Sequence, residues 1–132
     1  MHSNKRWPVF ILSIALILGI LQPYPIVSAE SEQTYENYDE NDKDANVICA
    51  KAADELLTIS DITASFVIGK LGDKVCISGR SIGDINVQII LEKLGGGGHI
   101  TLAGAQVEGL SIGEVKNLLI EKINEYFEEQ QN

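Results

Sequence analysis

The sequence predicts an α/β fold, a small mixed sheet with helices packed on it, in the order α-β-β-α-β-α. Segments with apolar residues every three or four positions alternate with shorter segments in which every second residue is apolar. Gly- and Asp-containing turns separate these segments, and the 132 residues suffice for one domain with a modest core. We expect that domain at residues 45–130, behind an N-terminal targeting segment at residues 1–29 and an acidic linker at residues 30–44.

The first 29 residues have the pattern of a signal peptide. Lys5 and Arg6 precede an apolar run from Val9 to Leu21, and small residues ending at Ala29 provide a cleavage site. The run is shorter than the roughly 20 residues that a membrane-spanning helix needs. An uncleaved anchor reaching from Trp7 to Val27 is the alternative, and either arrangement places the domain outside the membrane or on its outer face.

The linker is rich in carboxylates and poor in aliphatic residues, so it is predicted to be disordered. The whole chain has a formal net charge of −9. An acidic protein repels a polyanion, so long nucleic acid is not expected as a partner. A small nucleotide held by a local basic cluster remains compatible with this charge.

A helix from Ala45 to about Thr58 is predicted first, with Asp44 as its N-cap. Its apolar face consists of Ile48, Ala52, Leu56 and Ile59. A strand at residues 62–70 follows, with Ala64, Phe66 and Ile68 on one side.

The second strand, from Lys74 to Arg80, follows a turn at Gly72-Asp73. A period of two places one set of side chains on one face, Val75, Ile77 and Gly79, and the other set on the opposite face, Cys76, Ser78 and Arg80. Ser78 and Arg80 are therefore presented together. Alternatively, Arg80 is an ordinary cation at the end of the strand that pairs with one of the many acidic residues.

The second half of the domain repeats the alternation of helix and strand. Asp84 is predicted to cap a helix that leads to Gly95, with Val87, Ile90, Leu91 and Leu94 facing inward. A strand near Ala105–Glu108 comes next. Ser111 and Glu114 form a capping box for the last helix, whose apolar stripe comprises Ile112, Val115, Leu119, Ile123 and Tyr126.

Four consecutive glycines, Gly95 to Gly98, are followed by His99. Glycine lets a ligand approach backbone amides closely, as anion-binding loops require, and a histidine there can donate to a phosphate oxygen. This pattern indicates a phosphate site. Read alone, the run is also typical of a flexible connector.

Three stretches carry a resemblance to a known family: AKAADELL at residues 50–57, ASFVIGKLGD at 64–73 and SGRSIGDINVQIILEKLGGGGH at 78–99. Residues 50–106 resemble the DHH-associated domain, subfamily one, of the DHH-family phosphoesterases, in particular the C-terminal part of the cyclic-di-AMP phosphodiesterases. The resemblance implies that this part holds the phosphates and terminal nucleotide of the substrate. It assigns that role here to Ser78, Arg80, Ser81, Gly95, Gly96, Gly97, Gly98 and His99.

This chain departs from the family pattern at four positions near those residues. Gly79, Leu102, Gly104 and Ala105 stand where the resemblance leads us to expect alanine, asparagine, alanine and threonine. The departures bear on ligand preference.

The resemblance also implies which residues phosphodiester cleavage requires. Family members hold their metal ions with Asp and His residues of a separate DHH domain, which contains an Asp-His-His run. This sequence has no such run, and its two histidines are His2 and His99. We therefore expect no catalytic residue and no metal ligand here, with Mn²⁺ or Mg²⁺ only if a DHH partner subunit supplies the ligands.

The predicted function is a non-catalytic module that binds a small nucleotide or short oligonucleotide. The alternatives are an enzyme half that is active only with a separate DHH-domain protein, and an inert product of a truncated gene. A homodimer is also compatible with the sequence. Export by the N-terminal segment conflicts with the cytoplasmic location of the family.

Two cysteines, Cys49 and Cys76, are predicted on a helix and a strand. Export would favour a disulfide between them, whereas the cytoplasmic ancestry that the resemblance implies favours packed thiols.

Overall fold

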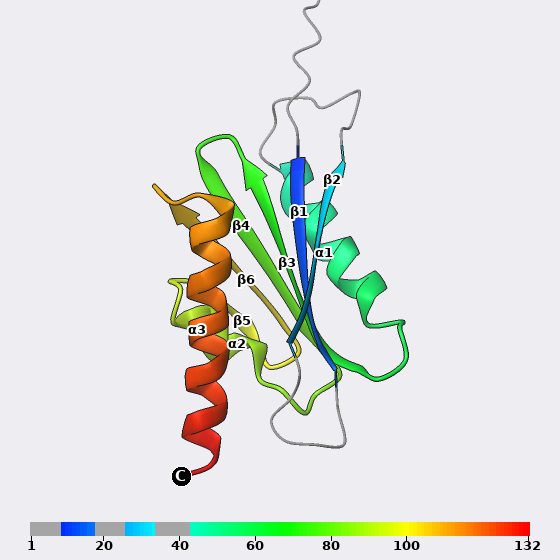
Figure 1. Ribbon diagram of the computed structural model, residues 1–132, viewed down its shortest axis with the longest axis vertical. Helices are drawn as coiled ribbons and strands as arrows, with labels where there is room; N and C mark the ends of the chain where they lie inside the picture. Colours follow the sequence, from blue (N-terminus) through cyan, green and yellow to red (C-terminus); the bar gives the residue numbers. More distant parts are fainter. Residues whose placement is uncertain (1–8, 18–25, 34–42) are drawn as a thin grey trace, which may run out of the picture.

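The computed structural model describes residues 9–17, 26–33 and 43–132, and it confirms the α/β class. Figure 1 shows a single sheet flanked by helices. In chain order the elements are β1 (Val9–Ile17), β2 (Ile26–Gln33), α1 (Lys43–Leu56), β3 (Ile62–Leu71), β4 (Lys74–Ser81), α2 (Val87–Glu92), β5 (Gly97–His99), β6 (Leu102–Glu108) and α3 (Ile112–Gln130).

The six strands of the described part lie in the order β2-β1-β3-β4-β6-β5. Each of these neighbouring pairs is antiparallel, so the predicted mixed sheet is wrong. The reason is β5, which the sequence did not predict. A strand-helix-strand crossover from β4 directly to β6 would make those two strands parallel, whereas the additional β5–β6 hairpin reverses the chain once more.

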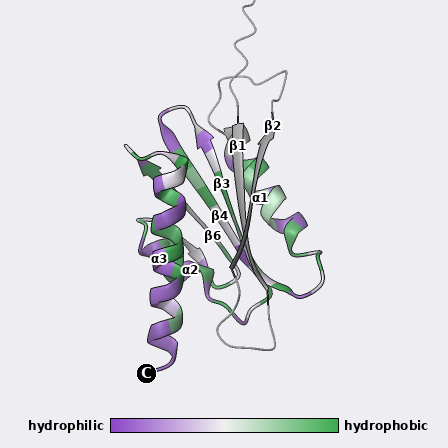
Figure 2. Ribbon diagram, in the orientation of Figure 1, coloured by the Kyte–Doolittle hydropathy of each residue, from purple (hydrophilic) through white to green (hydrophobic). Residues whose placement is uncertain are grey.

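The helices divide between the two faces of the sheet (Figure 1). Helix α1 packs on β3 and β4, while α2 and α3 pack on the opposite face. The main core lies on the α2 and α3 side, and its largest fully buried side chains include Phe66, Ile68, Ile77, Leu91 and Leu119. Colouring by hydropathy shows the purple, hydrophilic side of α3 turned away from the sheet (Figure 2).

A second, smaller cluster lies between α1 and the sheet. It consists of Cys49, Ala53, Val67 and Cys76. Helix α1 ends at Leu56, earlier than predicted, and Ile59 therefore lies beyond it and is 53% exposed instead of completing an apolar face. Because α1 contacts β3 and β4, the neighbouring strands β6 and β5 keep an open surface on that side.

Helix α2 begins two residues later than predicted, because Asn86 and not Asp84 is its N-cap. The Asn86 side chain accepts a hydrogen bond from the Ile89 N–H. Upstream, the Ser81 hydroxyl donates to the Ile85 carbonyl at 2.7 Å, which fixes this segment as a tight loop. The first helical residue is therefore Val87, whose N–H donates to the Ile100 carbonyl across the loop.

The predicted capping box of α3 is confirmed. The Ser111 hydroxyl accepts from the Glu114 N–H, and the Glu114 carboxylate accepts from the Ser111 N–H. The hydrogen bond from the Ser111 backbone holds the pKa of Glu114 below its usual value. The predicted stripe is buried on the sheet at Val115, Leu119, Ile123 and Tyr126, with Ile112 half-buried.

The N-terminal residues of the described part form strands. β1 pairs with β3, and β2 pairs with the outer side of β1. The predicted linker at residues 30–44 overlaps β2 at its first residues and α1 at its last residues, so these parts are not disordered as predicted. Residues 1–8, 18–25 and 34–42 lie outside the described part. Processing of residues 1–29 and export stay predictions. Among the described residues, the helices are too short or too polar to cross a membrane.

Candidate nucleotide site

Strand β4 presents Ser78 and Arg80 on the face covered by α1, as the period of two predicts. The neighbouring residue Gly79 faces the opposite way, where an added Cβ would lie 3.1 Å from Phe66 Cε1 and from Leu91 Cδ1. Gly79 therefore fits the close packing of the main core. Of the four departures from the family pattern, this one faces the main core and does not line the pocket.

Arg80 is nearly buried, at 9% exposure, and is held in a defined orientation. Its Nε donates to Asp54 Oδ1 at 2.9 Å, and its Nη1 donates to the Gly79 carbonyl at 2.8 Å. A guanidinium has five N–H donors, so this arrangement leaves donors for a ligand. The predicted pairing of Arg80 with an acidic residue is confirmed. Its role in binding a ligand stays a prediction for a residue that lies at a pocket.

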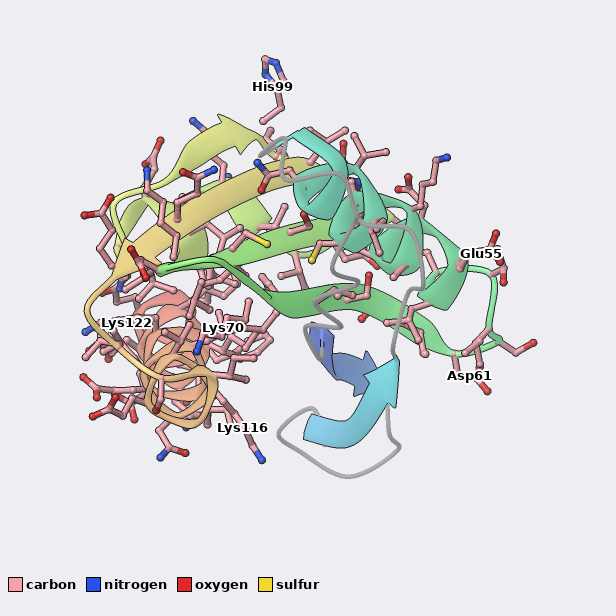
Figure 3. The ribbon with its side chains drawn as sticks, turned by 90° about the horizontal axis from the view of Figure 1, so that it is seen from above. Glu55, Asp61, Lys70, His99, Lys116 and Lys122 are labelled. Atoms are coloured by element: carbon pink, nitrogen blue, oxygen red, sulfur yellow. The ribbon has the colours of Figure 1, made fainter. Side chains whose placement is uncertain are left out.

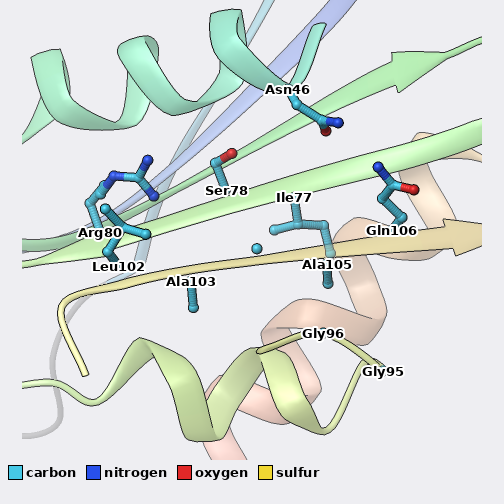
Figure 4. Close-up of a pocket in the computed structure, with 11 residues that line it drawn as sticks. Asn46, Ile77, Ser78, Arg80, Gly95, Gly96, Leu102, Ala103, Ala105 and Gln106 are labelled. Atoms are coloured by element: carbon cyan, nitrogen blue, oxygen red, sulfur yellow. The ribbon is translucent and has the colours of Figure 1, made fainter. Parts of the chain in front are cut away.

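That pocket has a volume of about 490 Å³ and lies beside α1, β4, β6 and the start of the glycine run (Figure 4). It brings together four of the residues that the sequence predicted for binding: Ser78, Arg80, Gly95 and Gly96. The other lining residues are Asn46, Ile77, Leu102, Ala103, Gly104, Ala105 and Gln106. Three of the four departures, Leu102, Gly104 and Ala105, thus line the pocket itself.

The predicted residues Ser81, Gly97, Gly98 and His99 are not part of this lining. Ser81 is buried, and its hydroxyl is committed to the Ile85 carbonyl. His99 is exposed, and Figure 3 shows its side chain extending away from the fold. Ser81 therefore shapes the loop, and His99 is free to reach a ligand from outside the pocket.

Strand pairing connects His99 with Arg80. Arg80 is opposite Leu102 on β6, and Leu102 is opposite His99 on β5. Residues directly opposite each other in a sheet point to the same face, so the three side chains form one row. The spacing of two strands separates the Arg80 and His99 backbones by roughly 10 Å. A ligand that spans the row meets a cation at one end and an imidazole at the other.

The glycine run has a structural role in addition to any binding role. The N–H groups of Gly95 and Gly96 donate to the Glu92 and Leu91 carbonyls, so they close the end of α2. An added Cβ on Gly96 would lie 2.1 Å from the Gly104 oxygen, and one on Gly98 would lie 2.4 Å from the Leu102 oxygen. These glycines allow β5 to pair closely with β6.

Three residues of the site were not predicted from the sequence: Asp54, Asn46 and Gln106. Asp54 is on the exposed side of a helix and Gln106 on a strand, where polar residues are usually only solvated. Gln106 could have been identified from its spacing, since it lies two and four residues after Gly104 and Leu102 on the same face. Within the part of the chain that the structure describes, the side chains of Asn46, Ser78 and Gln106 make no hydrogen bond to protein.

No cluster of three or more His, Cys, Asp or Glu residues that could hold a metal ion occurs in residues 9–17, 26–33 and 43–132. Cys49 and Cys76 are both buried free thiols with their sulfur atoms 3.5 Å apart. The Cys76 thiol also donates to the Gly69 carbonyl. The hydrogen bond to Cys76, together with burial, raises the pKa of Cys49 well above its ordinary value. These thiols lie beneath α1 and do not line the pocket.

The described part of the chain is a small α/β domain with a pocket lined by one oriented arginine, one free hydroxyl and a glycine-rich edge. Residues 34–129 match the DHHA1 domain family, and the chain belongs to this family. The resemblance found in the sequence is thereby confirmed.

The relatives are much longer proteins. The chain is 54% identical over 91 residues to the cyclic-di-AMP phosphodiesterase GdpP of Geobacillus thermodenitrificans, covering 68% of this chain and 14% of that protein. It is 46% identical over 89 residues to the cyclic-di-AMP phosphodiesterase PdeA of Listeria monocytogenes, covering 67% of this chain and 14% of the relative. A match of 38% over 61 residues to the bifunctional oligoribonuclease and PAP phosphatase NrnA of Thermus thermophilus covers 46% of this chain and 19% of NrnA.

Proposed function

We propose that this chain is a nucleotide-binding module that holds an adenine dinucleotide or a short oligonucleotide by its phosphates and does not cleave it alone. The observation that carries the proposal is Arg80, which Asp54 orients beside a pocket large enough for part of a nucleotide. The names of the relatives support cyclic-di-AMP as the first ligand to test, and we test its linear form beside it.

The polar groups of the pocket suit a phosphate better than a neutral ligand. The guanidinium of Arg80 forms charge-assisted hydrogen bonds to phosphate oxygens, and the Ser78 hydroxyl is a further free donor on the same face. His99, in the same row as Arg80, is placed to contact a second phosphate or a base. The acidity of the chain, −9 overall, restricts this attraction to small ligands.

Isothermal titration calorimetry of the full chain with cyclic-di-AMP and with linear diadenylate tests the proposal. We expect micromolar to millimolar binding, weakened by Arg80→Ala at least about 10-fold, since hydrogen bonds to charged groups contribute about 1.5–3 kcal/mol. His99→Ala should weaken binding less, because His99 lies outside the pocket. Lys116→Ala is a matched control, since this cation is on α3 across the sheet. A folded wild-type chain that binds neither ligand would contradict the proposal.

A second candidate is half of a phosphodiesterase that acts with a separate DHH-domain subunit. Exposed apolar side chains next to the pocket favour it: Ile82, Ile100 and Leu102 are 61%, 53% and 48% exposed. The hydrogen bond from the Ser81 N–H to the Thr101 carbonyl holds their segments together. Adding a purified DHH domain and measuring diadenylate hydrolysis tests this candidate, and an absence of both association and hydrolysis would exclude it.

A further inference from the structure

Two thiols face each other between helix α1 and strand β4. The Sγ atoms of Cys49 and Cys76 are 3.5 Å apart, and both residues are 1% exposed. A disulfide requires a sulfur–sulfur distance of about 2.0 Å, so a displacement of about 1.5 Å would join them. The two sulfur atoms are therefore already close to bonding distance.

Strand β3 leaves space for the two sulfur atoms. Gly69 is opposite Cys76 in the sheet, and an added Cβ there would lie 2.6 Å from the Cys49 Sγ and 3.5 Å from the Cys76 Sγ. Gly69 is a strand residue without a positive φ, so this position provides space and not backbone freedom. A side chain at Gly69 would push the Cys49 sulfur out of its present place.

Helix α1 forms one side of the pocket, but its buried contact with the sheet is small. The Ser65 hydroxyl donates to the Ala53 carbonyl at 2.7 Å, and Arg80 donates to Asp54. Both of these hydrogen bonds reach the C-terminal part of the helix, whereas the pocket residue Asn46 is near its start. Elements with few buried apolar contacts are the ones that open locally. The buried cluster beneath the helix comprises Cys49, Ala53, Val67 and Cys76.

A bond between the two sulfur atoms would fix the middle of α1. Cys49 lies three residues after Asn46 and five residues before Asp54 on the helix. Cys76 lies four residues before Arg80 on the same face of β4. The bond would join residues that are 27 positions apart in the sequence, and cross-links that close loops of this length stabilise folded proteins.

We propose that Cys49 and Cys76 form a reversible disulfide site that holds α1 more firmly on β4 when it is oxidised. With a small-molecule disulfide as the oxidant, the thiolate of one cysteine attacks a sulfur atom of the oxidant and releases one thiol. The thiolate of the other cysteine then displaces the second thiol and forms the Cys49–Cys76 bond. The oxidant accepts two electrons, and the two cysteine protons leave on the two released thiols.

Both sulfur atoms are buried, so this exchange takes place while the chain folds or when α1 opens from the sheet. The oxidised state fixes the side of the pocket that carries Asn46 and Asp54. The site does not depend on which ligand the pocket binds, and it goes beyond the proposed function.

Equilibration of the full chain with mixtures of reduced and oxidised glutathione tests the proposal, in buffer and in concentrated urea. Starting from reduced and from oxidised protein verifies that equilibrium is reached, and mass spectrometry after acid quenching gives the disulfide content. At one glutathione mixture, we expect the ratio of disulfide to dithiol to be at least about 30-fold higher in the folded chain. A cross-link that stabilises the fold is favoured by folding to the same extent.

Hydrogen exchange of the α1 amides provides a second readout. We expect these amides to exchange at least about 10-fold more slowly in the oxidised chain than in the reduced chain. Reduction with dithiothreitol should restore the faster exchange without any mutation. The double variant Cys49→Ala/Cys76→Ala is the matched control, and the oxidant should leave its α1 exchange unchanged.

Equal disulfide content in the folded and unfolded chain would overturn the proposal, because the two thiols would then be packed side chains only. A disulfide that forms only between two chains would overturn it as well. Unchanged exchange of the α1 amides in a chain that carries the Cys49–Cys76 bond would contradict the effect on the helix.

Discussion

Arg80 on β4 donates from Nε to Asp54 Oδ1 on α1 at 2.9 Å, which joins the helix to the strand directly beside the pocket. The Arg80 side chain is 11% exposed and the Asp54 side chain 61% exposed. The Asp54 carboxylate therefore contacts the guanidinium from the solvent side. The remaining N–H groups of Arg80 are available to a ligand in the pocket.

Asp54→Ala should weaken dinucleotide binding about 3- to 10-fold while changing stability little. The pair is half in solvent, so its loss costs at most about 1 kcal/mol of folding free energy. Binding suffers more because a guanidinium that Asp54 no longer orients is mobile in the free protein and must be ordered when the ligand binds, which costs conformational entropy. Calorimetry and urea unfolding measure the two quantities. Glu55→Ala removes the adjacent exposed carboxylate as a control, and an equal loss of affinity in that variant would refute the specific role of Asp54.

Gly96→Ala should destabilise the domain by about 2 kcal/mol or more, whereas Gly97→Ala should change stability by less than about 0.5 kcal/mol. A Cβ on Gly96 would lie 2.1 Å from the Gly104 oxygen, but one on Gly97 meets nothing within 4 Å. Urea denaturation of both variants provides the comparison. Similar stability of the two would mean that the β5–β6 approach is not as close as described.

Ser81→Ala should lower the stability of the domain, whereas Ser78→Ala should weaken the binding of phosphate. Ser81 is buried and donates to the Ile85 carbonyl at 2.7 Å, so its loss should cost about 1–2 kcal/mol of stability. Ser78 has a free hydroxyl at the pocket, so its loss should leave stability nearly unchanged and weaken phosphate binding. Urea unfolding and calorimetry distinguish them. A large stability loss in Ser78→Ala, with binding unaffected, would show that Ser78 is a structural residue.

The thiols of Cys49 and Cys76 should be protected in the folded protein. Both are buried, and the raised pKa of Cys49 keeps its thiol protonated at neutral pH. We expect alkylation by iodoacetamide at pH 8 to be at least about 100-fold slower in the folded chain than in urea. Mass spectrometry after timed quenching gives both rates. Rapid labelling of the native protein would indicate that α1 opens readily from the sheet.

Local rules were sufficient wherever a residue is determined by its chain neighbours. The alternation along β4 separated Ser78 and Arg80 from Ile77 and Gly79, and the pattern Ser111-x-x-Glu114 located the start of α3. The motif around the glycine run also led to the correct family, since its residue types are required at fixed spacing.

Local rules failed where contacts distant in sequence decide. Asp84 and Asn86 are both residue types that favour the N-cap position. Asn86 caps α2 because the hydrogen bond from Ser81 to Ile85 keeps the preceding residues in a loop. Glycines have low strand propensity, yet Gly97 and Gly98 form β5 because β6 offers a pairing edge.

The sequence by itself determined the family, the α/β class, the faces of β4 and the start of the last helix, because periodicity, capping and motifs act over a few residues. Only the tertiary structure decided that the sheet is antiparallel, that Asp54 orients Arg80, and that Asn46 and Gln106 share a pocket with them. These relationships join α1, β4 and β6. Packing of the core brings these elements together although they are far apart in the sequence. A local sequence pattern carries no information about such contacts.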